Sequence, residues 1–94
     1  MAWIITEDRI TDAARGEKSR VGWHSRKWNL DECPLLSLAA YAPHEFRMLD
    51  DDGEVYYLGR STVPDSFAPL DDLGTPDAGA TTIQYRRDGR WETL

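Results

Sequence analysis

The sequence predicts a β-rich α+β fold: a small, curved antiparallel sheet of about five or six strands, with one helix at about residues 32–41 packed on it. Short segments rich in β-branched and aromatic residues recur between glycines and aspartates, as in strands joined by tight turns. Only one segment spaces its apolar residues like the buried face of a helix. A length of 94 residues suits a single domain over 1–94 and is too short for two.

The first strand is expected at residues 3–6, where Trp, Ile, Ile and Thr follow one another. Residues 11–20 are polar and include Gly16, so a loop is expected there. A short second strand is expected at residues 21–24, although Gly22 weakens it.

The helix is predicted from one apolar stripe and from its two ends. Four apolar residues follow at i, i+3, i+4 and i+7: Leu35, Leu38, Ala39 and Ala42. Asp31 is a suitable N-cap, and Pro34 falls in the first turn, where no intrahelical hydrogen bond is lost. Pro43 disfavours helical angles at the residue before it, so the helix ends there.

A first hairpin is expected around the acidic run that ends in Gly53. A two-residue Asp-Gly turn would pair Met48 with Tyr57, but a three-residue loop over 51–53 brings more apolar residues opposite one another. It also places Gly53 at the left-handed bulge position that glycine suits, so the three-residue loop is predicted. Its apolar pairs are Met48–Tyr56, Phe46–Leu58 and Leu49–Val55.

A second hairpin is expected over residues 83–91 by the same logic. A loop over 87–89 would place Tyr85 opposite Trp91, a favourable aromatic pair.

Residues 61–80 between the hairpins are rich in helix breakers, so an ordered loop with one helical turn is expected. Three apolar residues recur at every third position and would pin the loop: Phe67, Leu70 and Leu73. Pro69 suits the start of the turn and Gly74 its end. Asp71 and Asp72 would lie near its positive end.

Acidic residues are concentrated in the second half of the chain. Residues 1–47 carry seven acidic and seven basic residues, whereas 48–94 carry ten acidic and four basic. Within 48–79 the count is eight acidic residues against one basic residue, Arg60. A field of this sign repels nucleic acid and favours basic surfaces. The competing interpretation is a solvated acidic face that keeps the protein soluble.

No catalytic, metal-binding or cofactor-binding site is predicted. If Gly53 held the sixth position of a calcium loop, Met48 and Gly59 would hold the first and twelfth, where oxygen ligands are required. The single cysteine, Cys33, excludes an internal disulfide. Its spacing from His24 and His44 matches neither a zinc set nor a thiolate dyad.

A cytoplasmic location without membrane attachment is expected. No secretory signal pattern opens the sequence, no apolar run is long enough to span a bilayer, and a lone cysteine suits a reducing compartment.

Several segments resemble a group of small uncharacterised bacterial proteins. They read F-R-M-L-D-D-D-G-E-V-Y-Y-L-G-R, then F-A-P-L-D-D-L-G-T-P-D-A-G, then I-Q-Y and G-R-W-E-T-L, with W-I-I-T-E-D at the start. The resemblance covers about two-thirds of the chain and leaves out roughly residues 10–45. This sequence departs from the group at Leu73, Asp77 and Ala80, where the group has Phe, Asn and Cys. The resemblance implies a bacterial or mobile-element origin and carries no site residues with it.

The predicted function is non-enzymatic binding of a protein partner. The hypothesis is an inhibitor or regulator of the anti-CRISPR or nucleic-acid-mimic type, which docks its acidic residues on a basic protein surface such as that of a nucleic-acid-binding protein. The expected contact residues are Asp50, Asp51, Asp52, Glu54, Asp71 and Asp72.

Two alternatives from other classes stay open. One is a small hydrolase or metal-dependent enzyme that uses the same carboxylates. The other is a nucleic-acid-binding module that uses Trp23, Trp28 and nearby basic residues, although the overall acidity counts against direct binding of nucleic acid.

Overall fold

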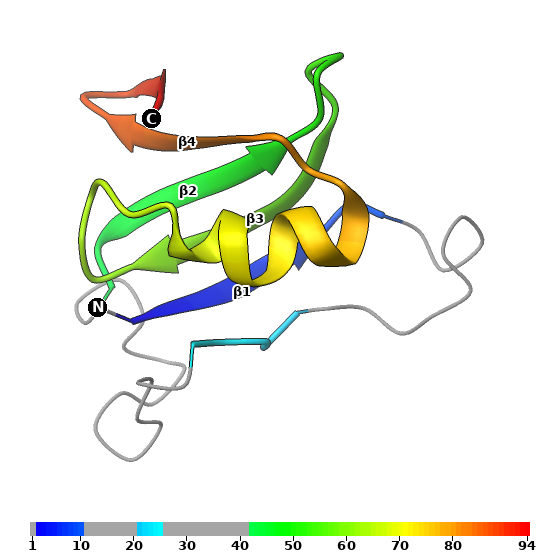
Figure 1. Cartoon of the computed structure of the whole chain (residues 1–94). Coiled ribbons are helices and arrows are strands. Elements are labelled where there is room, and N and C mark those ends of the chain that lie inside the picture. Colours follow the sequence, from blue (N-terminus) through cyan, green and yellow to red (C-terminus); the bar gives the residue numbers. More distant parts are fainter. Residues whose placement is uncertain (1, 11–20, 26–41) are drawn as a thin grey trace.

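The structure, a computed structural model, describes residues 2–10, 21–25 and 42–94 (Figure 1). Five strands form one antiparallel sheet in the order β1-β3-β2-β4-β5. Their bounds are β1 Trp3–Asp8, β2 His44–Leu49, β3 Val55–Ser61, β4 Thr82–Arg87 and β5 Arg90–Thr93. A π-helical segment, η2 (Leu70–Ala78), lies across one face of the sheet (Figure 1). A strand-rich α+β fold is therefore confirmed, and the helix predicted at about 32–41 lies outside the described residues.

β1 forms one edge of the sheet by pairing with β3, and a short segment borders its other side. Ile5 donates a backbone hydrogen bond to Trp23 at 2.8 Å and accepts one from Gly22 at 2.8 Å. A single antiparallel bridge joins Ile4 to His24. The strand predicted at 21–24 is thus limited to this bridge and its neighbouring hydrogen bonds.

The β2–β3 hairpin combines features of both registers considered from the sequence. Leu49 pairs with Val55, as the three-residue loop predicts, but Met48 pairs with Tyr57 instead of Tyr56. A β-bulge between Met48 and Leu49 shifts the register, and Tyr56 is the extra residue. The predicted pairs Met48–Tyr56 and Phe46–Leu58 are therefore wrong.

The physical reason for this register is the contact between Phe46 and Gly59. Phe46 pairs with Gly59, and a Cβ atom on that glycine would collide with the Phe46 ring and with the Ile4 carbonyl oxygen. Glycine therefore makes room for the ring, and the same strand register buries Tyr57 completely.

The β4–β5 hairpin closes with a two-residue turn instead of the predicted loop over 87–89. Asp88 and Gly89 both have positive φ angles, 51° and 78°, as a type I′ turn requires. Arg86 then pairs with Trp91, and Tyr85 pairs with Glu92. The predicted pairing of Tyr85 with Trp91 is wrong, because the turn places these rings on opposite faces of the sheet.

The helical segment is longer than the single turn expected. It continues past Gly74 and through Pro76, and it ends at Gly79, whose φ of 73° suits a left-handed C-cap. Gly74 is a packing residue, since a Cβ atom there would lie 2.6 Å from the Met48 sulfur. The helix in the described part of the chain has neither the length nor the apolar character needed to cross a membrane.

The core fills the space between η2 and the sheet. Its buried residues are Trp3, Ile5, Phe46, Met48, Tyr57, Leu70, Leu73, Ala80, Ile83 and Tyr85. Leu70 and Leu73 pin the segment as predicted, but 48% of Phe67 is exposed, so its predicted core role is wrong.

Candidate partner-binding site

The structure assigns Asp50 to the turn of the β2–β3 hairpin. Its Oδ1 atom accepts hydrogen bonds from the backbone N–H groups of Asp52 and Glu54, each at 2.9 Å. Its Oδ2 atom accepts a third from the Tyr56 hydroxyl, also at 2.9 Å. These donors, with Glu54 N–H the strongest, hold the pKa of the Asp50 carboxyl below its usual value. The side chain closes the turn and has little capacity left for a partner.

The other three acidic residues at this hairpin tip are more accessible. Asp51 accepts a hydrogen bond from the Thr81 hydroxyl at 2.6 Å, which joins the tip to the residues that follow η2. Asp52 and Glu54 are exposed, and neither forms an ion pair with a described residue. The tip therefore offers two free carboxylates and one that is engaged.

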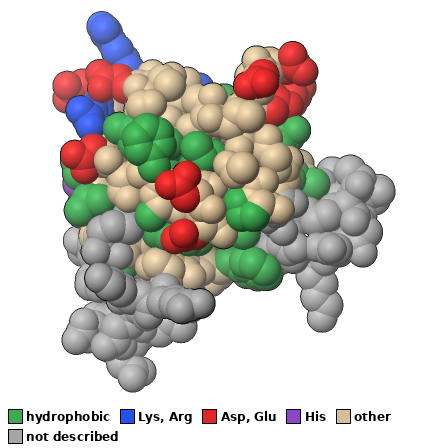
Figure 2. Space-filling model, viewed as in Figure 1, with side chains coloured by type: hydrophobic (Ala, Val, Ile, Leu, Met, Phe, Trp, Pro, Cys, Tyr) green, Lys and Arg blue, Asp and Glu red, His purple; other side chains and the backbone are tan. Residues whose placement is uncertain are grey.

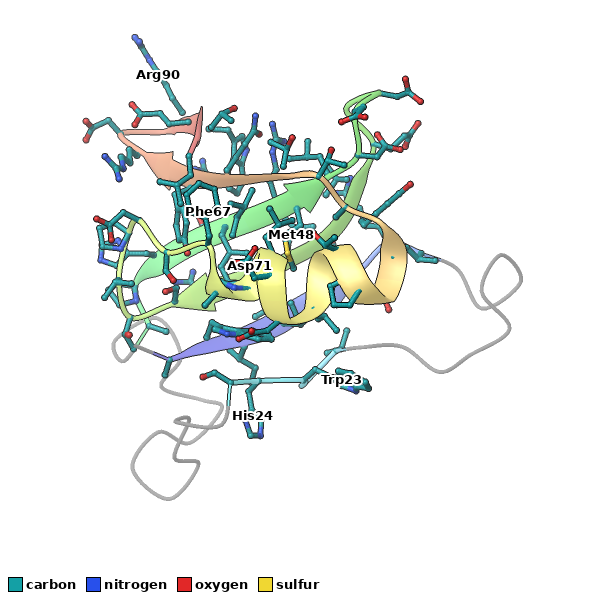
Figure 3. The ribbon with its side chains drawn as sticks, in the orientation of Figure 1. Trp23, His24, Met48, Phe67, Asp71 and Arg90 are labelled. Carbon is teal, nitrogen blue, oxygen red and sulfur yellow. The ribbon has the colours of Figure 1, made fainter. Side chains whose placement is uncertain are left out.

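Asp71 and Asp72 lie in the first turn of η2, on its solvent side. Two acidic groups occupy the middle of the molecular face in Figure 2, with apolar side chains around them. Figure 3 labels Asp71 on this helix, with Phe67 beside it. Neither aspartate forms an ion pair with a described residue. Negative charge is favourable at the start of a helix, so Asp71 and Asp72 also stabilise η2.

Phe67 is the residue of this surface that sequence reasoning missed. The backbone N–H of Asp71 donates to the Phe67 carbonyl oxygen at 2.9 Å, which places the two residues one helical turn apart. Successive members of the series Phe67, Leu70 and Leu73 are equally spaced, so the sequence contains no signal that only the two leucines are buried. The outcome is an exposed aromatic ring next to free carboxylates.

The six predicted contact residues thus do not form one continuous cluster. Figure 2 shows the hairpin tip and the helix as two separate acidic groups that are visible from the same side. We call the four residues of these groups that form no ion pair with a described residue the acidic face: Asp52, Glu54, Asp71 and Asp72.

Three arginines of the sheet contact residues outside this face. Arg86 and Arg60 both contact Glu45, at 3.4 and 3.3 Å. Arg47 donates from Nε to Gln84 Oε1 at 2.7 Å and lies 4.6 Å above the Trp91 ring. These arginines therefore contact a glutamate, a glutamine and an aromatic ring of the sheet.

The described residues give little support to the two alternatives, a metal-dependent or carboxylate-dependent enzyme and a nucleic-acid-binding module. Within residues 2–10, 21–25 and 42–94, no three His, Cys, Asp or Glu side chains are grouped so that they could hold a metal ion. Cys33 and Trp28 lie outside these residues. Trp23 is 47% exposed, and His24 contacts the Ser25 carbonyl oxygen at 2.8 Å.

These features define the chain as a small, strand-rich α+β protein with an exposed acidic face. Comparisons with protein-family models, with curated proteins and with solved structures found no match. The resemblance to small bacterial proteins therefore stays a prediction.

Proposed function

We propose that this protein is a non-enzymatic binding module that docks its acidic face on a basic protein partner. The biological role proposed is that of an inhibitor or regulator from a bacterial mobile element, acting in the cytoplasm in the manner of an anti-CRISPR or nucleic-acid mimic. The observation that carries the proposal is that two exposed carboxylates, those of Asp71 and Asp72, and the exposed ring of Phe67 occur together at the start of η2.

The two kinds of group have different tasks in this proposal. Carboxylates that replace phosphates on a basic surface release the counterions of that surface, which gives binding a steep salt dependence. An aromatic ring adds apolar contact that salt does not screen, and such rings are enriched among the residues that dominate interface energies. Asp71 and Asp72 would therefore attract and orient the partner, and Phe67 would retain it.

The acidic tip has a secondary part. Asp52 and Glu54 extend the same negative field, but the hairpin tip that carries them stands apart from the helical segment (Figure 2). We expect them to speed association through long-range attraction more than to slow dissociation.

The test compares matched charge-removing variants in a pull-down from bacterial lysate at low and high salt. Retained proteins are identified by mass spectrometry, purified and titrated against wild type, Asp71→Asn/Asp72→Asn, Phe67→Ala and Asp88→Asn. Asp88 is an exposed turn aspartate outside the acidic face, so its variant serves as the control for lost charge.

A basic partner that loses at least tenfold in affinity with the helix double variant and with Phe67→Ala, but not with Asp88→Asn, supports the proposal. A loss with Asp88→Asn as large as that with the helix double variant would reduce the effect to net charge and contradict a defined site. A partner that binds every variant like wild type would overturn the proposal.

A further inference from the structure

β5 forms an edge of the sheet that no described residue covers. The strand order places it at the end opposite β1, and its sole partner in the sheet is β4 (Figure 1). β1, by contrast, is bordered by the hydrogen bonds to Gly22 and Trp23. An uncovered edge strand presents unpaired backbone groups to which another strand can bind.

The hydrogen-bond phase of the β4–β5 ladder shows which groups point outward. Leu94 donates to the Ile83 carbonyl oxygen at 3.1 Å. In an antiparallel ladder hydrogen-bonded pairs alternate, so Arg90 and Glu92 direct their backbone groups toward β4. The N–H and C=O groups of Trp91 and Thr93 therefore face away from the sheet.

The side chains of this edge are charged in a pattern that complements itself. Arg90 and Glu92 flank Trp91 and share one face of the strand, because alternate residues point to the same side. Arg90 extends away from the molecule (Figure 3) and forms no ion pair with a described residue. Glu92 is 3.7 Å from Arg87 and more than half exposed.

An antiparallel second copy of β5 can be placed in two main registers. In the first register, Trp91 lies opposite Trp91 of the second copy. Each Arg90 then lies opposite a Glu92 on one face of the sheet, and the two indole rings meet on the opposite face. If Trp91 lies opposite Thr93, more backbone hydrogen bonds form, but the two Glu92 side chains lie opposite each other. Opposite charges across a strand pair stabilise it and like charges destabilise it, so the first register is favoured.

We propose that β5 pairs with β5 of a second copy of this chain, in the antiparallel register centred on Trp91. A two-fold axis through this residue would join the two sheets into one continuous sheet with two Arg90–Glu92 ion pairs. A second copy is the occupant because the charge pattern of β5 is complementary to itself. The acidic face contributes no residue to this contact, so the inference is independent of the proposed function.

The dimer is expected to be weak. A four-residue edge strand buries far less than the ~1,200 Å² typical of stable complexes. The net charge of −6 on each copy adds a repulsion that salt screens. Association should therefore appear only at high protein concentration and should strengthen from low to moderate salt.

The test is analytical ultracentrifugation of the full chain up to millimolar concentration, with Arg90→Glu, Glu92→Arg and both changes together. Each single variant places like charges opposite each other and should weaken self-association at least tenfold. The double variant should restore it, and so should an equimolar mixture of the two single variants, because opposite charges again meet. Circular dichroism confirms that each variant is folded.

Two outcomes would overturn the inference. One is a wild-type protein that stays monomeric throughout the concentration range. The other is self-association that Arg90→Glu leaves unchanged, or that neither the double variant nor the mixture restores.

Discussion

The Tyr56 hydroxyl donates a 2.9 Å hydrogen bond to Asp50 Oδ2 across the tip of the β2–β3 hairpin. Tyr56 is the extra residue of the β-bulge, so the irregularity in the ladder coincides with the residue that reaches the carboxylate. The same bond raises the pKa of the Tyr56 phenol, because ionisation would put two negative charges side by side. Asp50, predicted from the sequence to contact a partner, is therefore a structural part of the turn.

We expect Asp50→Asn to lower the melting temperature and to reduce its dependence on acid pH. The folded-state pKa of Asp50 is lowered, so the ionised carboxylate stabilises the fold above its unfolded-state pKa of about 3.9. This stabilisation is lost as the pH falls through the folded-state value. Thermal unfolding followed from neutral to acid pH checks the prediction. Asp52→Asn is the control, and equal acid profiles for the two variants would contradict the assigned role.

Gly59→Ala should destabilise the fold by about 3 kcal/mol, at the upper end of the cost of overpacking a core. The new methyl group would meet the Phe46 ring and the Ile4 carbonyl oxygen. Adding Phe46→Leu removes only the first of these obstacles, so it should not restore stability. Urea unfolding of both variants measures the effect, and a wild-type midpoint for Gly59→Ala would show that the contact is not tight.

Tyr85→Phe should lower the free energy of unfolding by about 1 kcal/mol, because the Ser66 carbonyl oxygen loses a hydrogen bond. The Tyr85 hydroxyl donates this bond at 2.7 Å from a ring that is almost fully buried. Burial also raises the pKa of the Tyr85 phenol, so the neutral phenol stabilises the fold until the pH rises through its folded-state value. Alkaline unfolding of wild type and variant tests both statements; a variant as stable as wild type at neutral pH would refute the first.

The turn of the β4–β5 hairpin should respond differently to two substitutions. Gly89→Ala should destabilise it by about 1 kcal/mol, since alanine is disfavoured at a φ of 78°. Asp88→Asn should be neutral or slightly stabilising, because Asn-Gly is the preferred pair for a type I′ turn. Thermal unfolding of both variants checks this contrast. Tolerance of alanine at position 89 would argue against the two-residue turn.

The sequence predicts the strands well because their signals are local. Glycines at positions 53 and 89 mark the two hairpins, and both adopt the left-handed angles expected of a turn glycine. The registers depend on contacts distant in sequence and could not be read locally. Gly59 faces both Phe46 and the Ile4 carbonyl oxygen, and neither contact leaves a trace in the hairpin's own pattern.

The same limit applies to the helical segment and to the candidate site. Gly74 is a common helix stop, but here its missing side chain makes room for the Met48 sulfur, so the helix continues. Asp50 and Asp52 are chemically identical in the sequence. They differ only through the geometry of the turn, in which Asp50 accepts hydrogen bonds from neighbouring residues and Asp52 stays exposed.

The strand order has a consequence for how the chain acquires its fold during synthesis. β1 precedes the other strands of this sheet in the chain, yet its partner in the sheet is β3, which follows β2. Ile4 and Ile5 can contact residues 22–24 early, but they lack their β3 partners until residues 55–61 have been added. The β2–β3 hairpin closes locally, whereas β1 must close a long loop, which is the slower step. Until β3 has been added, the nascent chain thus exposes the edge of β1 that β3 later covers, and a chaperone could bind this apolar strand during that period.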